Sequence, residues 1–394
     1  MTPNRLKILL VIPTLDRCGA EKQLTLLAAN LPKERFDVRV VALTRGGPYE
    51  ATLRDAGVPV DIIGKTAKFS PRAYWRLKKI IRDFRPDVVH TWLFAANAYG
   101  RRAAFSLGVP AVVCGERCLD PWKARWQGWV DRRLEPKTDA FAVNSSGIVD
   151  FYVERGIPAE KFVVIPNAVE PPTFPRSADS ATADAAKIAL LKELKLPYEP
   201  GRLPFLIGLV ARLWPQKRVK EALWAADQLK FAQLDFYLLV IGDGPERESL
   251  LRYRDALRAT DRVRFLGERD DVSRLMPTFD LLWNCSAYEG QSNAILEAQS
   301  CGVPVVASDV PGNRDLVIPG ETGVLIPEFD GDRIRRRTAL TRETFRLLKP
   351  ENAERRRALA DAARARVERE FSLDALIARH VELYERLVAE KKRR

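Results

Sequence analysis

Short apolar runs alternate with longer amphipathic stretches in roughly the first 170 residues of the chain. The runs are rich in Val, Ile and Leu, and helical periodicity fills most of the gaps between them. This strand–helix alternation predicts a parallel sheet with helices on both faces. The predicted strands are Leu6–Ile12, Val38–Leu43, Val58–Ile63, Val88–Leu93, Ala111–Cys114, Ala140–Val143 and Phe162–Ile165.

The alternation breaks after Pro166, where the proline-rich segment 170–175 is followed by the small residues of 177–186. We interpret 173–203 as a linker, because proline and small residues at this density are typical of connections. The alternation then restarts. The predicted strands of the second half are Pro204–Val210, Phe236–Ile241, Val263–Leu266, Phe279–Trp283, Pro304–Ala307 and Val324–Ile326.

The two halves predict an α/β protein of two Rossmann-like, doubly wound domains that face each other across a cleft. We place the first domain at 1–172 and the second at 204–372. The stretch 373–394 predicts a last helix with one apolar face. Ligands of such sheets bind at the carboxyl ends of the strands, so we expect the binding residues in the loops at those ends.

Composition excludes several classes of protein. Hydrophobic residues make up 46% and charged residues 30%, which does not indicate disorder. No apolar run approaches the roughly 18–20 residues of a membrane-spanning helix. Five cysteines without paired Cys-x-x-Cys spacing and two histidines predict neither a disulfide framework nor a zinc site. We therefore expect a cytoplasmic protein that binds no metal.

The net charge of +13 is concentrated in one part of the first half. The span 72–133 holds 13 Lys and Arg against 5 Asp and Glu, a net of +8. Such a patch indicates an anionic surface or substrate.

The chemistry of the second half centres on the segment 284–297. The run Phe279–Trp283 predicts a buried strand, 289–292 a loop, and 293–300 a helix that Gly302 ends. The backbone N–H groups of Asn293, Ala294 and Ile295 would stand at the positive end of this helix, where an anion binds favourably. The carboxylates of Glu289 and Glu297 flank that position. A ligand with both a phosphate and a hydroxyl-rich sugar would use all of these groups, although two such glutamates are more often merely exposed.

Three other loops follow predicted strands. Arg212 and Lys217 end the first strand of the second half, where two cations can neutralise a diphosphate leaving group. Gly242 opens a tight turn before a helix that starts with a proline, a weak motif when taken alone. Gly19 starts a helix after the first strand and permits close approach of a phosphate, although an ordinary turn explains it equally well.

The two glutamates, followed by Ala298 and Gly302-Val303-Pro304, resemble the signature of retaining glycosyltransferases of the large GT4 type. The resemblance implies the GT-B fold, in which the last helix crosses back to the first domain. It implies that Arg212 and Lys217 contact the donor diphosphate and that Glu289 contacts hydroxyls of the donor sugar. Segments ending in Gly242 and Gly267 resemble those that lie near the nucleotide and its base.

The sequence departs from the GT4 pattern at three positions. Cys18 stands where the family usually has a first glycine, Trp92 where many members have a second histidine, and Arg218 where glycine commonly follows the lysine. His90 ends the strand 87–90. A lone histidine in an apolar strand is more often a core residue, whereas the resemblance implies that it contacts the transferred sugar.

The resemblance also implies a mechanism. The acceptor attacks on the face from which the diphosphate departs, and the diphosphate takes the acceptor's proton, so the protein positions groups and stabilises charge without a metal or other cofactor. The expected substrates are a nucleotide sugar, with UDP as the expected nucleotide, and a glycan or lipid-linked acceptor in bacterial surface polysaccharide or glycolipid synthesis. The first domain would hold the acceptor and the second the donor.

Two basic helical stretches, 72–84 and 122–134, carry tryptophan beside Lys and Arg. Helices of this kind lie on anionic bilayers, which would place the protein at the inner face of the plasma membrane; alternatively, their apolar faces dock on the sheet and the charges are solvated. A nucleotide-sugar epimerase of the same fold is the alternative enzyme. A nucleic-acid-binding protein is disfavoured, because the basic patch belongs to one domain and no recognised nucleic-acid motif is apparent.

Overall fold

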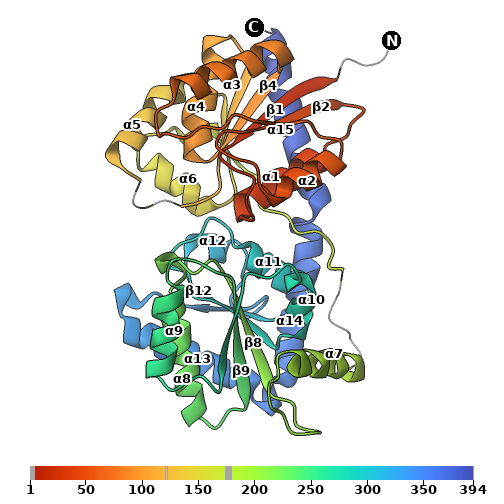
Figure 1. Ribbon diagram of the computed structural model, residues 1–394, viewed down its shortest axis with the longest axis vertical. Coiled ribbons are helices and arrows are strands. Elements are labelled where there is room, and N and C mark those ends of the chain that lie inside the picture. The colour runs from red at the N-terminus through yellow and green to blue at the C-terminus, as the bar shows by residue number, and fades with distance from the viewer. Residues whose placement is uncertain (1–4, 120, 122, 174–179, 394) are drawn as a thin grey trace. The chain divides into compact units, whose positions relative to one another are not determined.

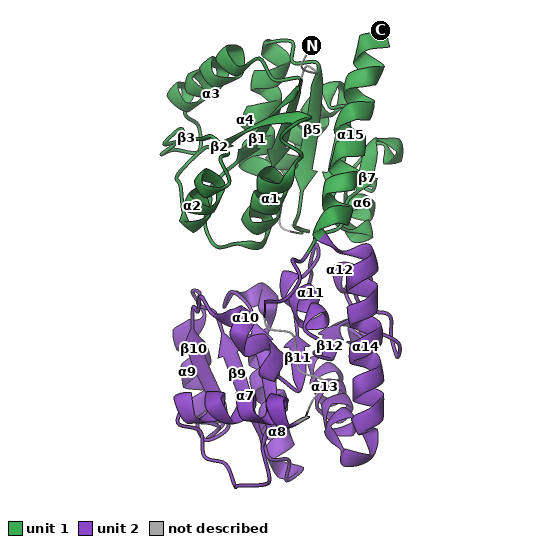
Figure 2. Ribbon diagram, turned by 90° about the vertical axis from the view of Figure 1, so that its right-hand side faces the viewer, with its two compact units in different colours: residues 1–168, 373–394 green, residues 169–372 purple. Residues whose placement is uncertain are grey.

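The computed structural model describes residues 5–119, 121, 123–173 and 180–393. The chain forms two compact units: unit 1 comprises Met1–Ala168 and Leu373–Arg394, and unit 2 comprises Val169–Ser372 (Figure 2). The division after Ala168 lies slightly before the predicted end of the first domain at 172. Each unit has its own sheet and its own hydrophobic core.

Unit 1 contains a parallel sheet of seven strands in the order β3-β2-β1-β4-β5-β6-β7 (Figure 1). The chain adds strands outward from β1 in one direction, then returns to add β4 on the other side of β1. This reversal creates the crevice beside β1 that doubly wound sheets use for ligands. The strands are β1 (Leu6–Ile12), β2 (Phe36–Ala42), β3 (Val60–Ile62), β4 (Val88–Trp92), β5 (Ala111–Glu116), β6 (Ala140–Val143) and β7 (Phe162–Val164).

Helices cover both faces of this sheet, because alternate strand residues point to opposite faces. Ile8 and Leu10 pack with helices α1, α2 and α15, whereas Leu9 and Val11 pack with α3 and α4. The helices of unit 1 are α1 (Gly19–Asn30), α2 (Pro48–Asp55), α3 (Pro71–Phe84), α4 (Leu93–Ser106), α5 (Arg125–Leu134), α6 (Ser146–Val153) and α15 (Leu373–Arg393).

The last helix, α15, belongs to unit 1 although the residues before it, Val169–Ser372, form unit 2. Leu376, Leu383, Tyr384 and Leu387 are buried in the core that α1 and β1 also line. The prediction that the terminal helix crosses back to the first domain is therefore confirmed. The resemblance to GT-B enzymes implied this crossing, and the apolar face of the helix is the surface that packs on the core.

Unit 2 contains a parallel sheet of six strands in the order β10-β9-β8-β11-β12-β13, with the same reversal beside its first strand. The strands are β8 (Phe205–Val210), β9 (Phe236–Ile241), β10 (Val263–Gly267), β11 (Leu281–Asn284), β12 (Val305–Ser308) and β13 (Val324–Ile326). The helices are α7 (Ser180–Glu193), α8 (Val219–Phe231), α9 (Arg247–Ala256), α10 (Val272–Leu275), α11 (Asn293–Ser300), α12 (Pro311–Arg314), α13 (Arg333–Leu348) and α14 (Ala353–Glu370).

The predicted linker 173–203 is not a plain connection. It contains α7, in which Leu190 and Leu191 are buried against Tyr237 and Phe279 of unit 2. Alanine-rich sequence thus forms a packed helix here, because burial of two leucines outweighs the weak amphipathic signal. Residues 174–179 of the predicted linker lie outside the described residues.

All thirteen predicted strands overlap observed strands, with ends that differ by one or two residues. The first basic stretch forms α3 as expected. The second begins at Arg125 rather than at 122, and Trp122 lies outside the described residues. None of the helices in the described part of the chain combines the length and the apolar character that crossing a bilayer requires.

Candidate active site

The candidate site of unit 2 lies at the carboxyl ends of β8 and β11, the two strands between which the sheet changes direction. The loop after β8 carries Arg212 and Lys217, and the loop after β11 carries Glu289. Parallel strands bring their carboxyl ends to one edge of a sheet, and ligands of doubly wound folds bind where the order reverses. The structure therefore places these three predicted residues around one switch point.

Hydrogen bonds tie the two loops to each other. The amide of Ala287 donates to the carbonyl of Gln216 at 2.8 Å, and the Gln216 side chain donates to the carbonyl of Tyr288 at 2.7 Å. Lys217 follows Gln216, and Glu289 follows Tyr288, so both charged residues are held by their neighbours' bonds. Sequence reasoning missed Gln216, since a glutamine in a loop gives no signal of its partner.

The side chains of Lys217 and Glu289 form an ion pair. Glu289 is 6% exposed, and its carboxylate also accepts a hydrogen bond of 2.7 Å from the hydroxyl of Ser286. The segment 284–297 contains no lysine or arginine, so the cation that pairs with Glu289 comes from 72 residues earlier in the chain. It fixes the carboxylate in one orientation and brings the lysine charge to the same point.

Arg212 is exposed, and its guanidinium lies 5.3 Å from the centre of the Trp214 ring. A cation stacked on an aromatic ring keeps its hydrogen-bond donors directed to the sides. A hydrogen bond joins its loop to the loop after β9: the amide of Leu213 donates to the carbonyl of Asp243 at 2.9 Å.

Gly242 lies against the loop of Arg212. Its φ is +125°, and a Cβ at this position would stand 2.0 Å from the carbonyl oxygen of Ala211, so glycine is required. The Gly242 amide donates to the carbonyl of Gly267 at 2.7 Å, where β10 ends. The two predicted glycines are thus hydrogen-bonded to each other, and Gly242 packs against the backbone of the loop that carries Arg212.

Helix α11 starts at Asn293, as predicted, after the N-cap Ser292. Its first regular backbone bond joins the amide of Leu296 to Ser292 at 3.3 Å, so the N–H groups of Asn293, Ala294 and Ile295 precede the helical ladder. The Ile295 side chain is buried in the core, which leaves its backbone as the group that could serve a ligand. Glu297 is half-buried in the second turn.

Gly19 lies in unit 1, at the start of α1 and after β1, beside that unit's own switch point. The Thr14 hydroxyl donates to the Glu21 carboxylate at 3.0 Å across this loop. The structure thus gives Gly19 the predicted strand–loop–helix setting, and its role stays a prediction.

His90 is fully buried in unit 1, which contradicts the prediction that it touches the transferred sugar. Its ring lies between Trp92 and the α15 residues His380 and Tyr384, and its Nδ1 is 2.7 Å from the Tyr384 hydroxyl. A ring with no exposed surface offers nothing to a substrate. The alternative, a histidine of the core strand, is what the structure shows.

Burial sets the charge state of this cluster. It lowers the pKa of His90 well below its usual value, with smaller contributions from His380 and from Arg117. Burial also lowers the pKa of His380 to about 3, and Nδ1 of this ring is 2.9 Å from the carbonyl of Leu376, as a neutral donor would be. Arg117 lies 4.3 Å over the Trp92 ring, and burial lowers its pKa to about 9. Both histidines are therefore neutral at pH 7.

Two parallel Rossmann-like sheets with flanking helices are the architecture of GT-B glycosyltransferases, and solved structures agree. HepE of Anabaena, solved in complex with UDP-glucose, is similar with a TM-score of 0.82 and 22% identity, over 97% of this chain and 100% of that one. A lipopolysaccharide outer core galactosyltransferase, WaaB, is similar with a TM-score of 0.70 and 20% identity, over 98% and 100%.

The sequence comparisons define the family. The model for Glycosyltransferase Family 4 matches residues 18–171, and the model for Glycosyl transferases group 1 matches residues 204–339. An Escherichia coli UDP-Gal:alpha-D-GlcNAc-diphosphoundecaprenol alpha-1,3-galactosyltransferase is 29% identical over 77% of this chain and 79% of its own length. A 2-deoxystreptamine glucosyltransferase of Streptomyces kanamyceticus is 28% identical over 79% and 82%. The chain is a glycosyltransferase and belongs to the GT4 type.

The buried neutral histidines predict acid sensitivity of unit 1. Unfolding restores the ordinary His pKa of about 6.5, so the unfolded chain takes up protons below that pH and the folded one does not. Stability contributed by these groups is present above pH 6.5 and falls by about 1.4 kcal/mol per pH unit per histidine below it. Urea unfolding of the wild type and of His380→Gln at pH 7.5, 6 and 5 measures this. The variant should lose about 2 kcal/mol less between pH 7.5 and 5, and equal losses would contradict the assignment.

Proposed function

We propose that this glycosyltransferase is a retaining enzyme that moves a sugar from a UDP-sugar to a glycan or lipid-linked acceptor in the synthesis of a bacterial surface polysaccharide or glycolipid. The observation that carries the proposal is the ion pair of Lys217 with Glu289 at the switch point of unit 2, beside the start of α11. A cation, a carboxylate and a helix N-terminus in one place suit a diphosphate joined to a sugar.

The donor diphosphate is bound by Arg212, by Lys217 and by the first N–H groups of α11. Arginine grips phosphate oxygens with two donors at once, and the lysine supplies a point charge. Together they offset the charge that develops on the departing diphosphate. This neutralisation is the role that a metal ion has in other transferases, and we propose transfer without a metal or other cofactor.

The sugar hydroxyls are bound by Glu289. Its carboxylate is already oriented by Lys217 and by Ser286, so little ordering remains when a hydroxyl arrives. Glu297, in the second turn of α11, serves the nucleotide, and the backbone around Gly242 and Gly267 serves the base. UDP is supported by HepE, solved with UDP-glucose, and by the UDP-Gal in the name of the Escherichia coli relative.

The stereochemistry follows from what Glu289 does. A carboxylate that pairs with a lysine and accepts a hydrogen bond from a hydroxyl is a poor nucleophile, because both partners withdraw its electron density. We therefore propose same-face substitution. The bond from the anomeric carbon to the diphosphate oxygen breaks, the acceptor oxygen bonds to that carbon from the same face, and the acceptor's proton passes to the departing diphosphate.

Unit 1 is proposed to bind the acceptor, with the Gly19 loop at its switch point. The name of the Escherichia coli relative specifies an acceptor linked to diphosphoundecaprenol, which supports a lipid-linked acceptor for this chain. His90 is left out of this assignment because its ring is buried.

A membrane surface supplies such an acceptor, and α3 and α5 fit one. On α3, Ala73, Leu77 and Ile81 are buried, whereas Trp75 is 62% exposed. Arg72, Lys79 and Arg82 share its outer face, at separations of seven and three residues, or about two turns and one turn of helix. On α5, Trp126 and Trp129 are 57% and 60% exposed beside exposed Arg125, Arg132 and Arg133. Tryptophan among cations suits the headgroup region of an anionic bilayer, so we propose peripheral binding at the cytoplasmic face of the plasma membrane.

Replacing either donor cation should weaken nucleotide binding. Arg212→Ala and Lys217→Ala each remove a charge-assisted contact with the diphosphate, which corresponds to about 10- to 100-fold in the Kd of UDP. Lys220→Ala, an exposed lysine on α8, is the matched control and should bind as the wild type does. Isothermal titration calorimetry with UDP measures all three. Wild-type affinity in both Arg212→Ala and Lys217→Ala would refute the site.

Removing tryptophans from α5 should release the protein from anionic vesicles. The double variant Trp126→Ser with Trp129→Ser loses interfacial aromatic area while the charge stays constant, so sedimentation with phosphatidylglycerol vesicles should fall about tenfold. Phe231→Ser, 78% exposed in unit 2, is the control and should sediment as the wild type does. If the wild type does not sediment, or if the double variant sediments equally, the membrane assignment is wrong.

A further inference from the structure

Arg218 has a backbone conformation that suits glycine. Its φ is +47° and its ψ is +39°, the left-handed region that costs free energy for any residue with a Cβ. The residue joins the turn of Pro215–Lys217 to α8, and its amide donates to the carbonyl of Pro215 at 3.1 Å. Glycine adopts this conformation without strain, so an interaction of the arginine side chain is needed to offset the cost.

The side chain of Arg218 is anchored. Its Nη1 lies 3.0 Å and 2.8 Å from the two carboxylate oxygens of Glu328, which follows β13 closely in the chain. Nη1 of Arg336 lies 3.4 Å from the same carboxylate and 3.2 Å from the Glu328 carbonyl. A non-glycine residue is thus held at a left-handed position by an ion pair that glycine could not make.

A second ion pair also involves the start of α8. Arg336 donates from Nε and Nη2 to the two carboxylate oxygens of Glu221, each at 2.7 Å, with both side chains under 10% exposed. Glu221 lies in the first turn of α8, and its amide donates to the Arg218 carbonyl at 2.8 Å. Glu328 and Arg336 therefore clamp the start of α8 at two points, three residues apart.

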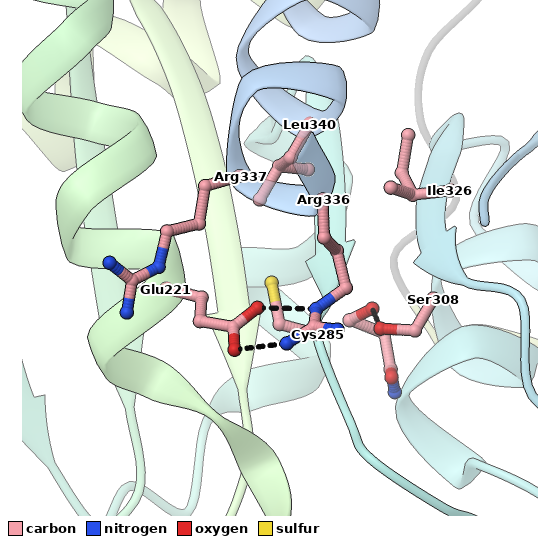
Figure 3. Close-up of a pocket in the computed structure, with 8 residues that line it drawn as sticks. Glu221, Cys285, Ser308, Ile326, Arg336, Arg337 and Leu340 are labelled. Carbon is pink, nitrogen blue, oxygen red and sulfur yellow. Dashed lines mark hydrogen bonds and ion pairs between the residues drawn. The ribbon is translucent and has the colours of Figure 1, made fainter. Parts of the chain in front are cut away.

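This clamp also supports the second loop of the donor site. Figure 3 shows Glu221 and Arg336 facing each other across their two bonds, beside Cys285 and Ser308. These residues line a small cavity of about 10 Å³, together with Asn284 at the end of β11. Asn284 and Cys285 lead into the loop that carries Glu289. The cavity is too small for a substrate, so its lining is best understood as support.

We propose that Arg218, Glu328, Arg336 and Glu221 form a positioning network that holds Lys217 and the Glu289 loop in the geometry that binds the nucleoside diphosphate. The proposal rests on the donor-site assignment above. Arg218 is a positioning residue: its anchored side chain compensates for the missing glycine, and it touches no substrate in this scheme.

The test compares alanine with glycine at one position. Arg218→Ala loses the anchor and keeps the backbone strain, so UDP should bind about tenfold more weakly and the amides of 217–221 should exchange hydrogen faster. Arg218→Gly loses the anchor but removes the strain, so affinity within twofold of the wild type and slow exchange should return. An ordinary loss of packing would affect glycine at least as much as alanine.

A second pair of variants tests the anchor itself. Glu328→Ala should weaken UDP binding severalfold in the wild-type background and should have no further effect in the Arg218→Gly background, since the anchor is no longer needed there. Arg258 provides the matched control. It has a left-handed φ of +51° and is exposed in the same unit, outside the donor loops, so Arg258→Ala and Arg258→Gly should bind UDP like the wild type.

The outcomes separate the two claims. If Arg218→Gly binds UDP as weakly as Arg218→Ala, or if Arg218→Ala binds like the wild type, the positioning network is refuted while the donor site stands. If the wild type binds no nucleoside diphosphate, both fall. Unchanged hydrogen exchange in Arg218→Ala would refute the anchoring of the loop independently of any ligand.

Discussion

The candidate site of unit 2 depends on the bonding between two loops that are far apart in the chain. The loops after β8 and β11 are joined by the contacts of Gln216 with residues 287 and 288, and by the ion pair of Lys217 with Glu289. β8 and β11 are neighbours in the sheet, so their loops lie side by side, and the hydrogen bonds fix the position of one loop relative to the other. Beneath them, Gly242 permits a backbone contact that any side chain would block.

Buried polar groups stabilise both units. In unit 1, His90, His380 and Tyr384 join the last helix to the first sheet, and burial keeps both histidines neutral. Buried ion pairs occur in both units: Arg101 with Asp131 in unit 1, and Arg336 with Glu221 in unit 2. Paired charges in a low-dielectric interior hold a geometry tightly, because breaking one pair leaves the partner unsatisfied.

Much of the fold could be predicted from the sequence because parallel strands buried on both faces are continuous apolar runs. All thirteen runs overlap observed strands. The apolar stripe of 373–394 predicted an amphipathic helix, and the resemblance to GT-B enzymes implied its return to the first domain. The helix α7 could not be predicted in the same way, since its alanine-rich sequence resembles a linker. Burial of Leu190 and Leu191 in the core of unit 2 stabilises it as a helix. The start of α5 differed because the first residues of a tryptophan-rich basic stretch carry no capping signal.

The site was predicted unevenly for a physical reason. Arg212, Lys217, Glu289 and the start of α11 follow strands directly, so the position of a residue in the chain indicates its place at the sheet edge. His90 lies inside β4, two residues before its end, and α15, nearly 300 residues later, covers its ring. Burial by a distant segment gives no local signal. The same holds for Glu328, whose partner Arg218 lies 110 residues away in the chain.

The most direct test of the central claim is a comparison of UDP with UMP as ligands of the wild type, by titration calorimetry at fixed salt. If two cations and a helix N-terminus at the switch point of unit 2 bind the second phosphate, UDP should bind at least about 30-fold more tightly than UMP. Equal affinity for the two nucleotides would show that these groups do not hold a diphosphate, and would contradict the account.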